Sequence, residues 1–219
     1  MQGAYCHPAE RNRLMHRTSR LIDPSERLMH QRVDVLAGRR QDDEVTVSYL
    51  NPKAAPVARG AGHAAVAHQR IAAGEVVVAF GGRCITRIEL DLLPATQQAR
   101  SIQIDEELFL AGATDPEPAD FVRHSCEPNC GLRGSSVVVA LRDIAAGEPV
   151  TFDHAMANGS DFDEFECPCG APSCRGKVTA DDWMLPELQL RYRGSFSPYL
   201  AARIGSLVAL GAERRAFAY

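Results

Sequence analysis

The segment that decides the fold is Phe121–Cys130, which reads Phe-Val-Arg-His-Ser-Cys-Glu-Pro-Asn-Cys. It holds two cysteines, Cys126 and Cys130, four positions apart. About forty residues later a second segment, Cys167–Cys174, reads Cys-Pro-Cys-Gly-Ala-Pro-Ser-Cys and brings three thiols into eight residues. Five of the seven cysteines of the chain therefore lie in two short segments of its C-terminal half.

The C-x-C-x4-C spacing of the second segment predicts a zinc site. Gly170 and Pro172 favour a turn that lets all three sulfurs face one point. A structural zinc needs four thiolate or imidazole ligands, so one ligand must come from elsewhere, and Cys126 or Cys130 could supply it. Such a distant ligand would fasten the C-terminal segment to the body of the domain. The alternative is a set of unrelated thiols, some of them buried as small apolar groups.

Composition indicates a globular protein. The chain has 219 residues, of which 45% are apolar and 24% charged, with a net charge of −4. That length fits one domain with appendages. No apolar run approaches the ~18 residues of a membrane helix, and residues 1–30 lack the apolar core of a secretory signal, so we expect a cytoplasmic protein without a membrane partner. No basic aromatic platform indicates nucleic acid binding.

The chain divides into four expected parts: an N-terminal extension (1–44), a main domain (45–156), a cysteine module (157–180) and a helical tail (181–219). In the extension, Leu14, Leu21, Leu28 and Val35 recur every seven residues, which allows one or two short amphipathic helices. The extension is interpreted either as a variable segment packed on the domain or as an arm that binds a partner.

Short β-like runs separated by Gly and Pro predict strands within Val45–Leu50, Glu75–Phe80, Ile102–Leu110, Ser136–Leu141 and Pro149–Phe152. In the tail, Asp181–Leu185 and Pro186–Tyr192 are expected to be short helices, with Thr179 as an N-cap. A longer helix should begin at Ser197-Pro198, with Leu200, Ile204, Leu207 and Val208 on one face. The expected fold is mainly β, with short C-terminal helices.

The deciding segment resembles the R-F-I-N-H-S-C-x-P-N-C motif of SET-domain methyltransferases. Ala140–His154 is similar to the family's A-L-R-D-I-x-x-G-E-E-L-T-F-D-Y, and Cys167–Gly176 to its post-SET module, C-x-C-x4-C-R-G. Upstream, Ile71–Glu75 resembles the family's I-x-x-G-E turn, which puts Gly62–Ala67 on its G-x-G-V-F-A segment. The resemblance implies a β-clip of small curved sheets in which one segment threads under another in a pseudoknot. It also implies that Cys126 completes a structural zinc site with Cys167, Cys169 and Cys174.

The resemblance further implies S-adenosylmethionine as cofactor and transfer of its methyl group to a lysine amine. The residues that match cofactor-binding positions are Gly62, His63, Ala64, Arg123 and His124. Phe152 matches an aromatic residue of the lysine channel. Trp183 lies where the family often places an aromatic residue near the cofactor, although core packing would explain it equally well.

Three positions depart from the family pattern. Ala64 replaces a glycine, Arg123 replaces the motif's asparagine, and His154 replaces the closing tyrosine that the family uses in catalysis. An imidazole can accept or donate one hydrogen bond, so His154 is a candidate catalytic residue. Tyr192 and Tyr199 in the tail could supply a hydroxyl instead, or be ordinary core or surface residues.

Acidic residues are frequent in residues 105–120 and 161–166, which suits a basic protein or peptide substrate or a cationic small molecule. A solvated acidic surface is the alternative. The expected function is protein-lysine N-methylation. The alternatives are a diverged enzyme that acts on a small molecule or uses S-adenosylmethionine differently, and a catalytically inactive peptide-binding module. The sequence leaves the oligomeric state open.

Overall fold

The structure, a computed structural model, describes residues 48–60 and 62–216, which belong to one compact unit that begins at Val45. The amphipathic pattern expected in residues 1–44 lies outside the described residues. Among those described, no helix is both long and apolar enough to span a bilayer.

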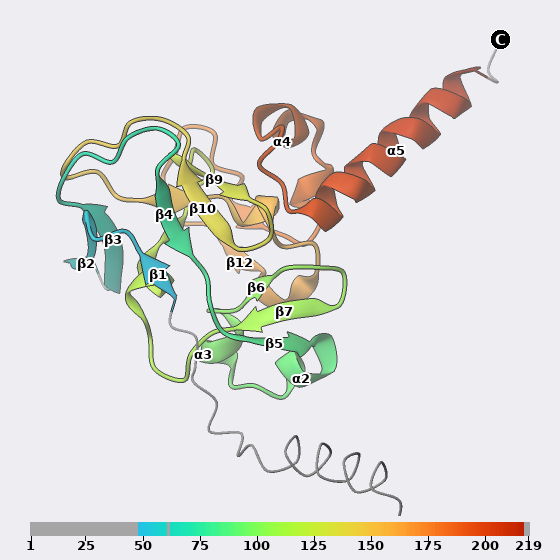
Figure 1. Cartoon of the computed structure of the whole chain (residues 1–219). Helices are drawn as coiled ribbons and strands as arrows, with labels where there is room; N and C mark the ends of the chain where they lie inside the picture. The colour runs from blue at the N-terminus through green and yellow to red at the C-terminus, as the bar shows by residue number, and fades with distance from the viewer. Residues whose placement is uncertain (1–47, 61, 217–219) are drawn as a thin grey trace, which may run out of the picture. The chain divides into compact units, whose positions relative to one another are not determined.

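The main sheet has four short antiparallel strands in the order β1-β4-β10-β9 (Figure 1). These strands are β1 (Tyr49–Leu50), β4 (Val76–Ala79), β10 (Val137–Ala140) and β9 (Cys130–Arg133). Val77, Val78 and Val138 are fully buried, so the centre of the sheet is covered on both faces. The predicted strands within Glu75–Phe80 and Ser136–Leu141 are confirmed as β4 and β10.

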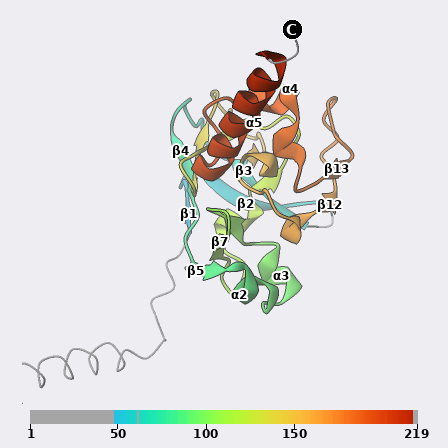
Figure 2. The ribbon, with the colours of Figure 1, turned by 90° about the vertical axis from the view of Figure 1, so that its right-hand side faces the viewer.

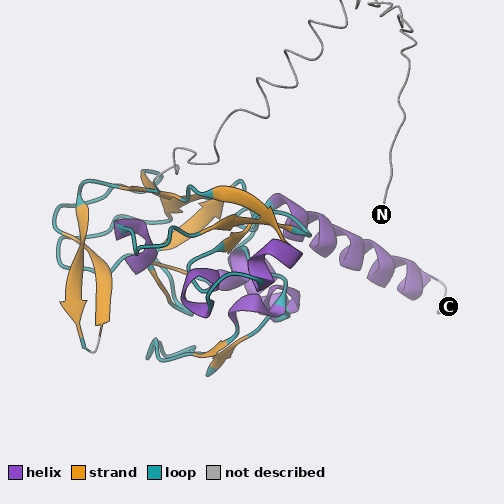
Figure 3. Ribbon diagram, turned by 90° about the horizontal axis from the view of Figure 1, so that it is seen from below, coloured by secondary structure: helices purple, strands orange, loops and turns teal. Residues whose placement is uncertain are grey.

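Four smaller sheets surround the main one, and Figure 3 shows all strands as short pieces joined by loops. An antiparallel hairpin pairs β2 (Ala54–Arg59) with β3 (Gly62–Ala67). A three-stranded sheet has the order β5 (Arg83–Thr86), β7 (Leu108–Ala111) and β6 (Ile102–Gln103). Two further pairs join β8 (Arg123–His124) to β11 (Thr151–Phe152) and β12 (Phe165–Glu166) to β13 (Lys177–Val178).

The helices are short except the last. The α-helices are α2 (Arg87–Asp91), α3 (Ala95–Gln98), α4 (Pro186–Arg191) and α5 (Pro198–Ala216). Single 3₁₀ turns are η1 (Pro118–Phe121), η2 (His154–Met156), η3 (Asp161–Asp163) and η4 (Asp182–Met184). Figures 1 and 2 both place α2 and α3 beside the three-stranded sheet and α4 and α5 at the opposite end. The prediction of a mainly β fold of small sheets with short C-terminal helices is confirmed.

The tail helices begin where the sequence predicts, but a shorter part of α5 packs against the core than its apolar pattern indicates. Leu200 is fully buried and Ile204 packs against the core, whereas Leu207 and Val208 are 43% and 59% exposed. Only the first turns of α5 therefore contribute to the core. The prediction of Thr179 as the N-cap is wrong, because Asp181 holds the N-cap position of η4; the Thr179 hydroxyl instead accepts a hydrogen bond from the Asp181 amide at 3.4 Å.

The parallel pairing of β8 with β11 positions the functional site. Thr151 lies opposite Arg123, Phe152 lies opposite His124, and the Ser125 amide donates to the Phe152 carbonyl at 3.2 Å. The chain between them runs through β9 and β10 of the main sheet, because parallel neighbours cannot be joined by a tight turn. Two motifs about thirty residues apart are thereby brought side by side.

Glu75 closes the turn that leads into β4, and it should make stability sensitive to acid. Its carboxylate accepts hydrogen bonds from Lys53 at 2.7 Å, Asn51 at 3.1 Å and the Ala72 amide at 3.0 Å. The hydrogen bond from Lys53, followed by those from Ala72 and Asn51, lowers the pKa of Glu75 from 4.5 to about 2.

Because the folded pKa is the lower one, the stabilisation is complete above pH 4.5 and is lost as the pH falls toward about 2. We expect Glu75→Gln to be less stable than the wild type in denaturant titrations at about pH 6, with the difference shrinking by about pH 3. Lys53→Met should likewise be less stable than the wild type at about pH 6, with a smaller difference at about pH 3. A difference that stays constant across this pH range would contradict the assignment.

Candidate functional site

A cavity of about 1000 Å³ opens where β3, β8, β11, η3 and β12 meet. Six residues that the sequence predicts for cofactor binding or catalysis line it: His63, Ala64, Arg123, His124, Phe152 and His154. Its lining also includes Asn158, Asp163 and Phe165, which the sequence did not single out as site residues. The cavity is the candidate active site.

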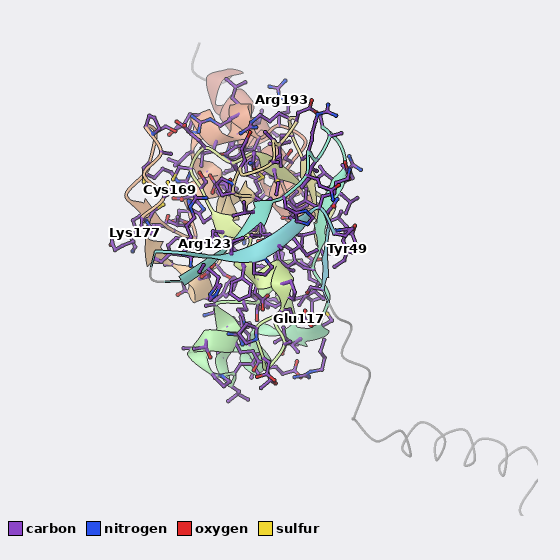
Figure 4. The ribbon with its side chains drawn as sticks, turned by 90° about the vertical axis from the view of Figure 1, so that its left-hand side faces the viewer. Tyr49, Glu117, Arg123, Cys169, Lys177 and Arg193 are labelled. Carbon is purple, nitrogen blue, oxygen red and sulfur yellow. The ribbon has the colours of Figure 1, made fainter. Side chains whose placement is uncertain are left out.

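The two walls formed by β3 and β8 are joined through Arg123, which Figure 4 labels. Its Nε donates a hydrogen bond to the His63 carbonyl at 2.5 Å. A Cβ atom on Gly62 would lie 2.5 Å from Nη2 of Arg123, so a larger residue there would require the guanidinium to move away from the hairpin backbone. Gly62 thus shapes the wall without being part of the cavity lining. Ala64 is accommodated without a glycine because it pairs with Val57 in a regular strand.

His154 lies among aromatic rings at the cavity wall. Its ring centroid is 5.1 Å from that of Phe152, 5.3 Å from that of His124 and 5.5 Å from that of Phe165. Its Nδ1 is 2.8 Å from Oδ2 of Asp163. No tyrosine is present among the described residues that line this cavity.

The two tail tyrosines proposed as hydroxyl donors lie elsewhere. Tyr192 donates to Oδ2 of Asp153 at 2.9 Å, and Tyr199 donates to the Ala157 carbonyl at 2.6 Å. Burial raises the pKa of both hydroxyls. These hydrogen bonds attach the tail to the rest of the domain. Of the three catalytic candidates, only His154 lines the cavity.

Trp183 is also outside the main cavity. It lines a separate surface cavity with Tyr199, and the guanidinium of Arg203 lies 5.4 Å from its ring centroid. Trp183 is 7% exposed and belongs to the main core cluster. Its surroundings correspond to the core-packing interpretation.

His124 joins the cavity to the cysteines. Burial lowers the pKa of His124 to about 4, although the nearby carboxylate of Asp153 opposes that shift, so the imidazole is neutral at neutral pH. Its Nδ1 accepts the backbone N–H of His154 at 3.4 Å, and its Nε2 lies 3.4 Å from Sγ of Cys126. A neutral ring with its proton on Nε2 satisfies both contacts.

The four predicted cysteines converge. The sulfurs of Cys126, Cys167, Cys169 and Cys174 all lie within 4.8 Å of one another. The Cys126–Cys167 sulfur separation is 3.9 Å, and sulfurs at about 2.3 Å from a tetrahedral zinc ion would be about 3.8 Å apart. Gly170, with a φ of 67°, turns the loop back on itself. The arrangement fits a closed four-thiolate zinc site.

Cys130, the other candidate for the fourth ligand, is excluded by its surroundings. It is fully buried, and its thiol donates to Oδ1 of Asn129 at 3.4 Å. Burial raises the pKa of Cys130 to about 12, so it remains a neutral thiol. The structure therefore selects Cys126.

A buried ion pair attaches the cysteine module to the domain. Arg175 donates two parallel hydrogen bonds to Asp153, at 2.7 and 2.8 Å, and a third to Asp182 at 2.8 Å. Burial would raise the pKa of Asp153, which is fully buried, but the Arg175 guanidinium outweighs burial and lowers it. Tyr192 donates to the same carboxylate, so Asp153 links the domain, the module and the tail.

The charges around the main cavity are mixed. Carboxylates of Asp120, Glu127, Glu148, Asp163 and Glu166 line it together with the guanidinium groups of Arg59, Arg100, Arg123 and Arg142. The negative charge expected from the acidic residues of the sequence is thus largely balanced by arginines at this cavity.

Comparison with known proteins gives consistent results. Residues 62–155 match the family model described as SET domain. The chain is 30% identical over 154 residues to the Saccharomyces cerevisiae "Histone-lysine N-methyltransferase, H3 lysine-4 specific", which covers 62% of this chain and 14% of the yeast protein. It is 30% identical over 119 residues to the human "Histone-lysine N-methyltransferase 2B", which covers 49% of this chain and 4% of the human protein.

Among solved structures, the chain is similar to KRYPTONITE in complex with mCHG DNA and SAH, with 28% identity and a TM-score of 0.42. That similarity covers 54% of this chain and 27% of the other. In each case the chain spans only a small part of its relative's length.

Proposed function

We propose that this chain is an S-adenosylmethionine-dependent protein-lysine N-methyltransferase, because residues 62–155 match the SET domain family model and the chain is similar to a yeast histone H3 lysine-4 methyltransferase. The observation that carries the proposal is the cavity that gathers four of the predicted cofactor-binding residues, His63, Ala64, Arg123 and His124, with Phe152 and His154. When bound, S-adenosylmethionine supplies a methyl group on a sulfonium centre.

The chain's own residues divide into two groups around the cavity. His63 and Ala64 on β3, with Arg123 and His124 on β8, form the side proposed to hold the cofactor. Phe152, Phe165 and His154 form the side proposed to receive the lysine. Aromatic faces favour a cationic ammonium group.

The proposed substrate is a basic protein segment that presents a lysine. The names of the yeast and human relatives refer to histone lysine, and the yeast name specifies lysine 4 of histone H3. A histone H3 N-terminal peptide is therefore the first substrate to test.

We further propose that the four cysteines hold one structural zinc ion. Four thiolates leave no open coordination position, so the ion would take no part in catalysis. Its role would be to close the loop of residues 167–174 against Cys126, beside the cavity that Cys169 helps to line.

Replacing His154 with alanine tests the catalytic assignment. We expect the rate of methyl transfer to the H3 peptide to fall about 100-fold, because the side chain that contacts the amine is lost. The binding of S-adenosylmethionine, measured by calorimetry, should change only a few-fold. The matched control is His68→Ala, which removes an exposed histidine outside the cavity. Equal rates for His154→Ala and the wild type would contradict the assignment.

A second candidate function is methyl transfer to a cationic small molecule. The observations that favour it are the histidine in place of the family's tyrosine and the mixed charges of the cavity. It predicts that wild-type protein consumes S-adenosylmethionine without labelling the H3 peptide or any other protein. Failure to bind S-adenosylmethionine would contradict both candidates and favour the peptide-binding module.

A further inference from the structure

We propose that Asp163 and Asn158 position His154 so that its Nε2 accepts a proton from the ammonium group of the substrate. This inference rests on the proposed function and assigns roles to two residues that the motifs do not mark. Asp163 and Asn158 act through His154 and are positioning residues, while His154 contacts the substrate.

The orientation of His154 follows from its partner. Nδ1 lies 2.8 Å from Oδ2 of Asp163, and an ionised carboxylate can only accept hydrogen bonds. The neutral ring therefore carries its proton on Nδ1, and Nε2 has a free lone pair. Within the described part of the chain, Nε2 has no hydrogen-bond partner, so this lone pair remains for a ligand.

Asn158 supplies an independent observation. Its Nδ2 donates to the same Oδ2 of Asp163 at 3.2 Å, which fixes the carboxylate. Asn158 is only 8% exposed, and its Oδ1 is buried without a hydrogen-bond donor among the described residues. A buried acceptor without a donor is destabilising unless a ligand supplies the donor.

Together these atoms suit an alkylammonium group. Asn158, Asp163 and His154 all line the cavity, as do Phe152 and Phe165. An ammonium group offers three N–H donors, so one could satisfy Nε2 of His154 and another Oδ1 of Asn158 while the aromatic rings face the cation.

The fold holds Asp163 firmly on η3. The neighbouring Phe162 packs edge-to-face on Phe109 at 5.1 Å, and Phe109 belongs to the smaller core beside α2. Asp161, two positions before Asp163, forms an ion pair with Arg87 at 2.9 Å, but its side chain is 73% exposed, so this pair contributes little to the position of Asp163. The packing of Phe162 on β7 thus holds η3 in place, with the Asp163 carboxylate 2.8 Å from Nδ1 of His154.

The proposed proton transfer needs no reactant other than the substrate ammonium group and His154. One proton moves from the ammonium nitrogen to Nε2 of His154, and the nitrogen keeps the electron pair of the broken N–H bond. The amine becomes a neutral nucleophile, and the imidazole becomes an imidazolium facing the carboxylate of Asp163.

Nitrogen-15 NMR of histidine-labelled protein tests the positioning directly and needs no substrate. In the neutral form of its ring, we expect His154 to show a protonated Nδ1 and an unprotonated Nε2. Its signals are assigned by their loss in His154→Gln. In Asp163→Ala, His154 should shift toward the form protonated on Nε2. Asp161→Ala removes a carboxylate from the same turn and should leave the His154 signals unchanged.

Methyl transfer to the H3 peptide completes the test. Asp163→Ala should lower kcat at least about 10-fold with KM changed less, whereas Asp161→Ala should remain close to the wild type. A wild-type His154 protonated on Nε2, or an unchanged kcat in Asp163→Ala, would overturn the inference. If the wild type transfers no methyl group, the proposed function fails, but the NMR result still decides whether Asp163 orients His154.

Discussion

Replacing Cys126 with serine is expected to release the zinc ion and to detach the cysteine module from the domain. Purified wild type should contain about one zinc per chain and the variant essentially none. The effect should be large, because structural zinc sites contribute about 10–16 kcal/mol of apparent binding free energy in small zinc domains. Metal analysis by mass spectrometry measures it.

Release of the zinc ion should also loosen the backbone at residue 126, which contacts the tail. The Cys126 carbonyl accepts hydrogen bonds from Arg191 at 3.0 Å and Tyr192 at 3.3 Å, so the same residue joins the module to the tail. Cys130→Ala is the matched control, since it removes a neighbouring thiol that lies outside the cluster, and it should keep the zinc. Zinc retained in Cys126→Ser, or lost in Cys130→Ala, would refute the ligand assignment.

Replacing Asp153 with asparagine is expected to lower the free energy of unfolding by about 3–5 kcal/mol. Asparagine has the same shape, but it removes the charge that balances Arg175 and turns an acceptor into a donor. The guanidinium would then be left buried with Asp182 as its one remaining carboxylate partner. Urea denaturation of zinc-loaded protein measures the change.

An exposed ion pair provides the comparison for this prediction. Arg70 and Asp143 contact each other with side chains that are 66% and 53% exposed. Arg70→Ala should therefore cost less than about 1 kcal/mol. If Asp153→Asn cost no more than Arg70→Ala, Asp153 would not be the link between domain, module and tail.

The sequence predicts the parts of the site that lie within contiguous motifs. His63, Ala64, Arg123, His124 and Phe152 face one cavity because each belongs to a motif with fixed spacing on a strand. The zinc ligands could be predicted for the same reason, but spacing alone left Cys126 and Cys130 equivalent. Their burial and the direction of their thiols separate them.

Contacts between distant side chains could not be predicted. The pairing of His154 with Asp163 depends on η3 being anchored to Phe109, a residue more than fifty positions earlier. Tyr192 and Tyr199 were candidates because they are tyrosines in a flanking tail, yet Asp153 and the Ala157 carbonyl take their hydroxyls.

Short elements with weak periodicity were also missed. Helices α2 and α3 have only five and four residues, too few to show an amphipathic repeat. The β2–β3 hairpin was not predicted as a pair of strands, since alanine is frequent in it and alanine does not favour strands.

The most direct test of the account is to identify the product of the reaction. Wild-type, zinc-loaded protein is incubated with S-adenosylmethionine carrying an isotopically labelled methyl group and a histone H3 N-terminal peptide, and all products are analysed by mass spectrometry. We expect labelled methyl-lysine in the peptide, and none when arginine replaces every lysine. An unlabelled peptide alongside a labelled small molecule, or cofactor that is neither bound nor consumed, would contradict it.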